Sequence, residues 1–414
     1  MSVAQPLTEG EPRPGLSYGW VIVAIAFMAT ALVLGSRFTL GMFLPYMPEA
    51  LNTSAADVSA AFAVSMIGAA IIQPLTGLLL DKLGGKAVLT LGLATAGFAL
   101  CGTSFANELW QVMLFMGLGS SVAFAAVSPV LTTAIVIDWF DKGRGAALGV
   151  ATSGTKVAMM VLPPILAVLI ASFGWRTAML SLGVAIWVLI PVVLVFVRTS
   201  PNQMKAVAAK KAGAASLLSG ATLQQALRMP AFWLIAVSLF ANGQVMNLVF
   251  IHLPNYMLSQ GYNEGMAALS LAVLAGVGVL GTVVTGVMAD KIGSRLMLMI
   301  MFGARGLSAA LVILVPGPVS LLLFVLVFGL LGYGAIGVIG VLASQLFGKR
   351  AIGAILGAAY VFNQVGGAAG VYSGGLAYDL TGNYTASLWL SVATTIVASI
   401  GITLLPRKSL AIND

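Results

Sequence analysis

Long uninterrupted apolar stretches recur along this 414-residue chain and restrict what it can fold into. A helix that crosses a lipid bilayer needs about 20 apolar residues, and twelve stretches bounded by charged or turn residues reach roughly that length. Only 8% of the residues are charged, against roughly 25% in soluble proteins. We therefore predict an all-α integral membrane protein with twelve transmembrane helices. In chain order, these spans 1 to 12 are residues 20–46, 57–80, 86–105, 109–138, 145–171, 176–198, 230–258, 264–289, 295–315, 319–347, 351–378 and 385–405.

One connection between the spans is much longer than the others. Residues 199–229 are rich in Ala, Gly and Ser and carry four basic residues. We predict a cytoplasmic linker here, joining an N-terminal six-helix bundle (1–198) to a C-terminal one (230–414). Within the linker, Thr222 is placed to cap a short interfacial helix.

The positive charges fix the expected orientation. Of the 20 Lys and Arg residues, 16 fall in the termini or in loops on the same side, and only Arg176 falls in a loop on the other side. Because cytoplasmic loops are rich in Lys and Arg, we expect both termini in the cytoplasm, in a plasma membrane (the inner membrane of a bacterium). The net charge of +8 then reflects topology, and no nucleic-acid partner is expected.

A ten-residue sequence occurs twice. Residues 77–86, GLLLDKLGGK, recur 209 positions later as residues 286–295, GVMADKIGSR. Each copy lies between two long apolar stretches, so the two halves of the chain repeat one another with the same topology. Duplicated membrane bundles of this kind usually rock around a shared central site, and the repeat therefore favours a carrier.

The repeated pattern Gly-x-x-x-Asp-Lys-x-Gly-x-Lys/Arg resembles the signature loop of the major facilitator superfamily. Three further strings, at 18–20 (YGW), 143–149 (GRGAALG) and 173–176 (FGWR), resemble its monocarboxylate and oxalate/formate branch. The resemblance implies alternating access by two six-helix bundles related by a pseudo-two-fold axis. It also implies a central cavity lined by spans 1, 4, 7 and 10.

Under this resemblance, the carboxylates of Asp81 and Asp290 lie at the cytoplasmic ends of spans 2 and 8. There they can face the positive N-termini of spans from the opposite bundle, while neighbouring charges add ion pairs. The alternative is that these charges only anchor the loops in water. We predict a cytoplasmic gate composed of Asp81, Lys82, Asp138, Arg144, Asp290 and Lys291.

Three cations fall inside spans, namely Arg37, Lys156 and Arg305, and no Asp or Glu falls near mid-depth in any span. Charge inside a membrane is rare and usually functional. Positive groups without an acidic partner should attract an anion and repel a cation. We assign Arg37 and Lys156 to an anion site, whereas Arg305, on an expected support helix, is given a structural role.

Uncharged polar residues cluster in spans 7, 10 and 11. Amides and a phenol can donate hydrogen bonds to a carboxylate, although each of them alone is more often a helix–helix contact. The predicted substrate-binding residues are Arg37, Lys156, Asn242, Gln244, Asn247, Tyr333, Asn363 and Gln364. His252, the only histidine, is a candidate for carrying a coupling proton.

The residue inventory argues against other kinds of site. With one cysteine and one histidine, the chain lacks the side chains for a cysteine metal cluster or a nucleophile–base pair. We expect no enzyme activity, no metal and no cofactor. Some residues typical of the branch are also missing, because span 8 lacks Arg and the expected span 11 Lys region holds Asn363 and Gln364.

The leading hypothesis is a monomeric secondary active transporter of a small organic anion, most simply a monocarboxylate, with the lipid bilayer as its surroundings. Proton symport and anion exchange are both compatible with the residues. A multidrug efflux pump is an alternative, but it usually needs a buried acid. A membrane receptor that kept the fold without transport is a third possibility, which the two intact loops disfavour.

Overall fold

The structure is a computed structural model that describes residues 16–128, 131–132, 135–136, 139, 144–198, 220–348 and 351–406. These residues are helical almost throughout. The N-terminal group of helices consists of α1 (Leu16–Ala29), η1 (Thr30–Leu34), α2 (Gly35–Thr39), η2 (Leu40–Met42), α3 (Met47–Ala50), α4 (Ala55–Ser104), α5 (Leu109–Val112), η3 (Met113–Gly119), α6 (Ser120–Ala126) and α8 (Arg144–Phe196).

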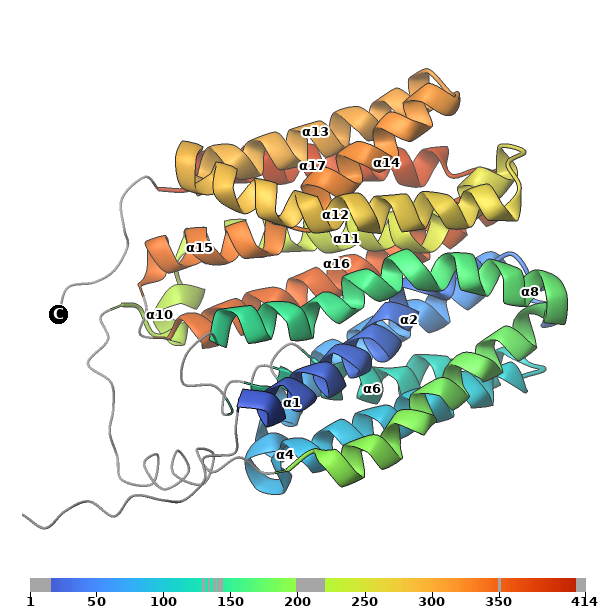
Figure 1. The fold of residues 1–414 in the computed structure, drawn as a ribbon. Helices are drawn as coiled ribbons and strands as arrows, with labels where there is room; N and C mark the ends of the chain where they lie inside the picture. Colours follow the sequence, from blue (N-terminus) through green and yellow to red (C-terminus); the bar gives the residue numbers. More distant parts are fainter. Residues whose placement is uncertain are drawn as a thin grey trace, which may run out of the picture.

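The C-terminal group lies beside it, as Figure 1 shows, and α16 and one arm of α8 run along the boundary. The C-terminal group consists of α11 (Pro230–Ser259), α12 (Glu264–Ile292), α13 (Ser294–Leu314), α14 (Pro318–Gly332), α15 (Ala335–Phe347), α16 (Ile352–Thr381) and α17 (Thr385–Leu404). Most of the predicted linker lies outside the described residues, so the domain division stays a prediction. Its last part forms α10 (Leu223–Leu227), and Thr222 caps this helix by accepting from Gln225 N.

The all-α membrane architecture is confirmed. In the described part of the chain, eleven helical segments are long and apolar enough to cross a membrane. One of them, Ala147–Phe196, has 50 residues and bends at Gly174, where φ is +81°. At 1.5 Å per residue this segment would be about 75 Å long, more than twice a bilayer core of about 30 Å. It therefore provides two crossings, and counting its arms separately gives the predicted twelve.

The sequence repeat extends to the backbone. Gly84 and Gly293, at equivalent positions of the repeated loop, both have positive φ, +79° and +90°. Gly174 and Gly382, in the loops after spans 5 and 11, also both have positive φ, +81° and +68°, although their ψ angles differ, 162° and 8°. Residues with a Cβ rarely adopt this conformation, so glycine is required at the same turn in both halves.

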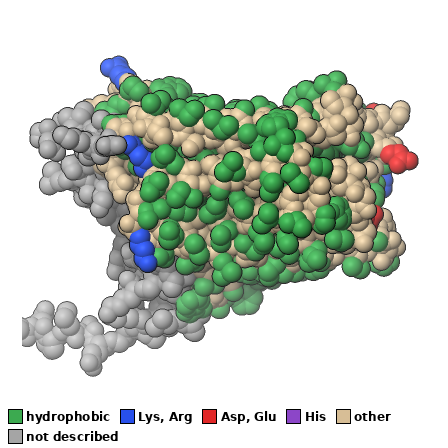
Figure 2. Space-filling model, turned by 90° about the horizontal axis from the view of Figure 1, so that it is seen from above, with side chains coloured by type: hydrophobic (Ala, Val, Ile, Leu, Met, Phe, Trp, Pro, Cys, Tyr) green, Lys and Arg blue, Asp and Glu red, His purple; other side chains and the backbone are tan. Residues whose placement is uncertain are grey.

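Charged side chains are separated along the long axis of the helices. We call the end where α1 begins and α17 ends the terminal face, and the opposite end the distal face (Figure 1). Figure 2 shows basic side chains mainly at one end, acidic side chains mainly at the other, and an apolar belt between them. The arrangement suits a protein embedded in lipid, and the cytoplasmic location of the termini stays a prediction.

The two groups touch closely near the distal face. A Cβ on Gly41 of η2 would collide with the backbone oxygen of Ile251 on α11. A Cβ on Gly375 of α16 would lie 2.8 Å from Ala55 O at the start of α4. By contrast, a Cβ on Gly149 or Gly353, near the terminal ends of α8 and α16, would meet no other part of the described structure within 4 Å. The distal contacts therefore close the seam between the groups at that end.

Replacing Gly41 tests this close contact. We expect Gly41→Val to lower the stability of the purified protein by about 1–3 kcal/mol, because the added side chain overpacks the seam. Gly149→Ala is the matched control and should be neutral or slightly stabilising, since alanine favours the helix. Thermal unfolding in detergent measures both, and equal melting temperatures for the two variants would contradict the packing.

Candidate functional site

Arg37 lies on an irregular part of the first membrane segment. The chain passes from α1 into a π-helical turn, η1, then into the short helix α2 and the 3₁₀ turn η2. Gly35 packs directly against Ala158 of α8, and Thr30 Oγ1 donates to Ala151 O at 2.9 Å. Irregular turns inside helices often accompany functional sites. Here the turn is held against α8 and presents Arg37 to the opposite group.

The Arg37 side chain is buried and reaches across the boundary. Its Nη2 donates to Oε1 of Gln364 on α16, at 3.2 Å, while its Nε has no partner in the described part of the chain. The guanidinium carbon lies 5.1 Å from the centre of the Phe124 ring. This cation therefore links the N-terminal and C-terminal groups through a neutral partner.

Lys156 makes a second link of the same kind. Its half-buried side chain extends from α8, and Nζ donates to Oγ1 of Thr282 on α12 at 2.9 Å. The Thr282 hydroxyl in turn donates to Gly278 O of its own helix, at 2.9 Å. Both predicted anion-binding cations thus lie at the boundary, and each bonds to an uncharged side chain of the other group.

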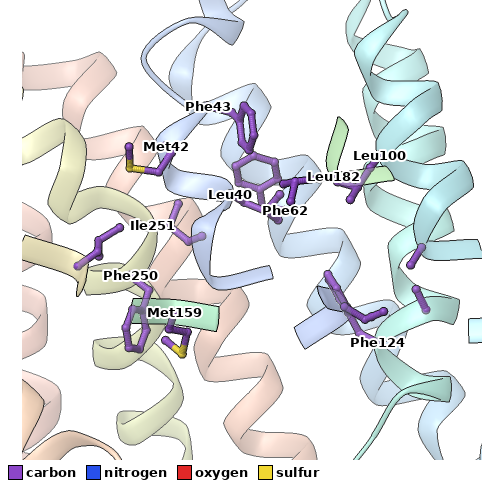
Figure 3. Close-up of a cluster of buried hydrophobic side chains, with 14 of the residues drawn as sticks. Leu40, Met42, Phe43, Phe62, Leu100, Phe124, Met159, Leu182, Phe250 and Ile251 are labelled. Atoms are coloured by element: carbon purple, nitrogen blue, oxygen red, sulfur yellow. The ribbon is translucent and has the colours of Figure 1, made fainter. Parts of the chain in front are cut away.

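Aromatic rings fill the space between these links. The rings of Phe38 and Phe250 are 5.0 Å apart, and those of Phe250 and Tyr333 are 5.7 Å apart. The Tyr333 hydroxyl donates to Met159 Sδ at 3.5 Å, so the row ends close to Lys156 on α8. Figure 3 shows Phe250 and Met159 in the buried hydrophobic cluster at this boundary. The site therefore combines two cations with an apolar aromatic row.

Acidic residues are absent from the interior of the described structure. The carboxylate side chains that it describes belong to Glu49, Asp57, Glu108, Glu264 and Asp379 towards the distal face, and to Asp290 towards the terminal face. No cluster of metal-binding side chains occurs among the described residues. Because electrostatic interactions strengthen in a low-dielectric interior, Arg37 and Lys156 give the boundary a positive potential.

Four of the predicted binding residues bond inside the C-terminal group instead. Their partners are Arg305 for Asn242, Ser391 and Thr394 for Gln244, Gly243 O for Asn247, and Leu239 O for Asn363. Hydrogen bonds of side-chain amides hold helices together within membranes, and of these four residues Asn247 alone bonds within its own helix, α11. The structure thus brings Arg37, Lys156, Tyr333 and Gln364 to the boundary, and the direct role of the four amides stays a prediction.

His252 lies within the C-terminal group and not at the boundary. Its ring is 2% exposed, Nε2 is 2.8 Å from Val371 O, and Nδ1 has no partner in the described part of the chain. It borders a cavity of about 20 Å³ whose other walls come from α11, α13, α14 and α17. The Tyr384 ring lies 5.3 Å away, and burial raises the pKa of this phenol, which therefore stays neutral.

The predicted gate at the terminal face is only partly visible. Asp290 and Lys291 lie at the end of α12, and both are exposed. Asp138 lies outside the described residues, as do the side chains of Asp81, Lys82 and Arg144. The gate assignment therefore stays a prediction.

The distal face carries a latch between the groups that the sequence analysis did not assign. The carboxylate of Asp379, at the end of α16, accepts from Ala55 N at 3.1 Å and Ala56 N at 2.7 Å. These amides open α4, where a negative charge is favoured. The Tyr46 hydroxyl adds a bond to Glu264 Oε1 at 2.5 Å, also between the groups. We call these contacts the distal latch.

Other residues of the site were also missed. The sequence analysis did not assign Thr282, and Phe38, Phe250 and Met159 could not be singled out, because apolar residues occur throughout every span. Tyr360 of α16 was not assigned to the site either. It precedes Gln364 by one helical turn and so shares its face. This spacing could have identified Tyr360 as a candidate from the sequence.

A multi-pass helical bundle with its polar residues at the boundary of two halves is the architecture of a membrane transporter. The family model of the Major Facilitator Superfamily matches residues 26–371, and the chain belongs to this superfamily. It is 30% identical to monocarboxylate transporter 11 of Homo sapiens over 423 residues, covering 97% of this chain and 85% of that protein.

Other relatives agree. Monocarboxylate transporter 13 of Rattus norvegicus is 27% identical, covering 96% of this chain and 91% of that protein. The uncharacterised MFS-type transporter YcxA of Bacillus subtilis is 24% identical, covering 91% and 92%. The fold also matches the nucleoside transporter NupG (TM-score 0.76, 15% identity, 94% of this chain and 99% of that chain). The chain is thus a transporter related to monocarboxylate transporters, and not an enzyme.

The distal latch can be tested by labelling. Ser59 is fully buried under Gly375, so a cysteine there becomes reactive only when the distal seam opens. The test uses a Ser59→Cys protein that lacks the native Cys101. In this background we expect Asp379→Ala to raise labelling by an impermeant maleimide about two- to fivefold, because it removes the stabilising free energy of one charge at a helix N-terminus. Glu49 and Asp379 both line a cavity of about 450 Å³ at the distal face, and Glu49→Ala, which removes an exposed charge there, is the control. Unchanged labelling in Asp379→Ala would contradict the latch.

Proposed function

We propose that this chain transports a small monocarboxylate by alternating access of its two groups of helices. One observation carries the proposal. Arg37 and Lys156 cross the boundary between the groups and bond there only to neutral oxygen atoms, at 3.2 and 2.9 Å, with no described carboxylate near them. The similarity to monocarboxylate transporters 11 and 13 supports the same class of substrate.

A carboxylate is the ligand that these donors lack. The Arg37 guanidinium can bind a carboxylate through two parallel hydrogen bonds in which both partners are charged, a stronger contact than its single bond to the neutral Gln364 amide. Lys156 offers a point charge with three donors, of which Thr282 occupies one. A small anion that takes these donors replaces weaker bonds between the groups with stronger ones of its own.

The aromatic row accounts for the rest of the substrate. Phe38, Phe250 and Tyr333 offer ring surface and one hydroxyl, which suits a short hydrocarbon chain better than a second charge. A cationic drug would meet two positive groups and no acid in the described interior. The site therefore favours a small anion with an apolar end.

Substituting the two cations tests the site. In proteoliposomes given labelled pyruvate or lactate in the outside medium, we expect Arg37→Ala and Lys156→Ala each to reduce uptake roughly ten- to a hundredfold, because each removes a charged hydrogen bond of about 1.5–3 kcal/mol. Arg228→Ala removes an exposed cation at the end of α10 and should transport normally. Normal uptake by both interior variants would reject this site.

The mode of coupling is a separate question, and symport and exchange both fit the site. A charged His252 would be desolvated among apolar side chains, which is costly, and its ring does not reach the boundary. We therefore expect the substrate to carry any coupled proton. His252→Gln should keep the dependence of uptake on an imposed pH gradient, as measured in the same vesicles. Selective loss of that dependence in His252→Gln would show that His252 carries the proton.

A further inference from the structure

Arg305 is the third interior cation, and its environment differs from that of the other two. It lies on α13, it is fully buried, and all of its described hydrogen bonds stay within the C-terminal group. Nη2 donates to Leu331 O and to Gly332 O, each at 2.6 Å, and Nη1 donates to Asn242 Oδ1 at 3.0 Å. No described carboxylate pairs with it. A buried charge held only by neutral acceptors needs a reason other than stability.

Its acceptors lie where a membrane helix is interrupted. α14 ends at Gly332 and α15 begins at Ala335, so the helical hydrogen bonding of the crossing from 318 to 347 is broken at Tyr333 and Gly334, although both residues keep helical φ and ψ angles. Gly334 lets the break approach α12, because a Cβ there would collide with Thr285 Oγ1. Carbonyl groups freed by a break inside lipid must find other donors. The Arg305 guanidinium supplies those donors to the last two carbonyls of α14.

Tyr333 occupies this break and belongs to the boundary site. Its ring packs on Gly278 of α12 and near Phe250 of α11, and its hydroxyl reaches Met159 of the N-terminal group. In a continuous helix, the amides of residues 335 and 336 would instead bond to Leu331 O and Gly332 O. The direction of the Tyr333 side chain therefore depends on the same carbonyls that Arg305 holds.

We propose that Arg305 is a positioning residue for transport: it holds the break in the helix pair α14–α15 and thereby sets Tyr333 against the substrate. The inference rests on the proposed function, since it takes Tyr333 to contact the transported anion. A planar guanidinium is required, because two carbonyls and one amide oxygen are engaged from two different nitrogens. The compact ammonium of lysine lacks this fork of donors.

Arg305→Lys and Arg305→Met separate geometry from charge. Arg305→Lys keeps the charge and loses the fork, whereas Arg305→Met keeps the length and loses both. For a positioning residue, we expect both variants to raise the KM for uptake about two- to tenfold, as for loss of a substrate hydrogen bond. A normal KM in Arg305→Lys with a raised KM in Arg305→Met would show that only charge matters and would overturn the proposal.

A double-mutant cycle with Tyr333→Ala identifies the route of the effect. If Arg305 acts through Tyr333, Arg305→Lys should change the KM little once Tyr333 is alanine, because coupled residues are not additive. An effect of the same size in both backgrounds would overturn the proposal. Asn242→Leu keeps Arg305 but removes one of its acceptors, and it should shift the KM in the same direction if the Arg305 variants fail to fold.

Hydrogen exchange gives a readout that needs no substrate. Amides of the segment 331–337 should exchange at a changed rate in Arg305→Lys and Arg305→Met, and at the wild-type rate in the control Arg228→Ala. Unchanged exchange in both Arg305 variants would refute the role of Arg305 at the break. If wild-type vesicles take up no anion while exchange at the break still responds, the proposed function fails and the structural part of this inference stands.

Discussion

Buried positive charge without a buried acid is the constraint on which the rest of this structure depends. Moving a cation into a membrane costs several kcal/mol on most scales. Each interior cation must therefore form hydrogen bonds to neutral oxygen atoms. Arg37 and Lys156 donate to acceptors across the boundary between two groups of helices, and Arg305 donates to acceptors at a helix break. The first two can exchange their partners for an anion, whereas the third bonds to two backbone carbonyls and the Asn242 side chain within one group.

Irregular segments place Arg37 and Tyr333 at the boundary. The π-helical turn and the 3₁₀ turn on either side of α2 carry Arg37 to the boundary, and the break after α14 carries Tyr333 there. Close contacts at Gly35 and Gly334 hold both segments against neighbouring helices. Departures from regular helix are tolerated inside a membrane only where protein covers them. Both irregular segments accordingly lie against other helices and not in the lipid-facing belt.

The sequence predicted the architecture well and the site in part. Span length, the Lys and Arg bias and the repeated loop predict a duplicated helical bundle, and equivalent glycines such as Gly84 and Gly293 share their backbone conformation. The buried cations were found because charge is rare in apolar segments. The sequence does not show in which direction an amide side chain points. It therefore could not tell that Gln364 faces the boundary whereas Asn242 and Gln244 bond within the C-terminal group. Apolar residues of the site such as Phe250 cannot be recognised from the sequence, since hydrophobic residues are expected at every depth of a span.

Two kinds of contact between the groups have different physical consequences for transport. The distal latch joins a carboxylate to helix N-terminal amides and packs glycine against backbone, so it is independent of the substrate. The bonds of Arg37 and Lys156 use the same donors that an anion would use. Binding therefore acts on the interior links directly and on the latch only through movement of the helices. A latch worth about 0.3–1 kcal/mol per charge is weak enough for such movement to open, and a stronger ion pair there would hold the carrier in one state.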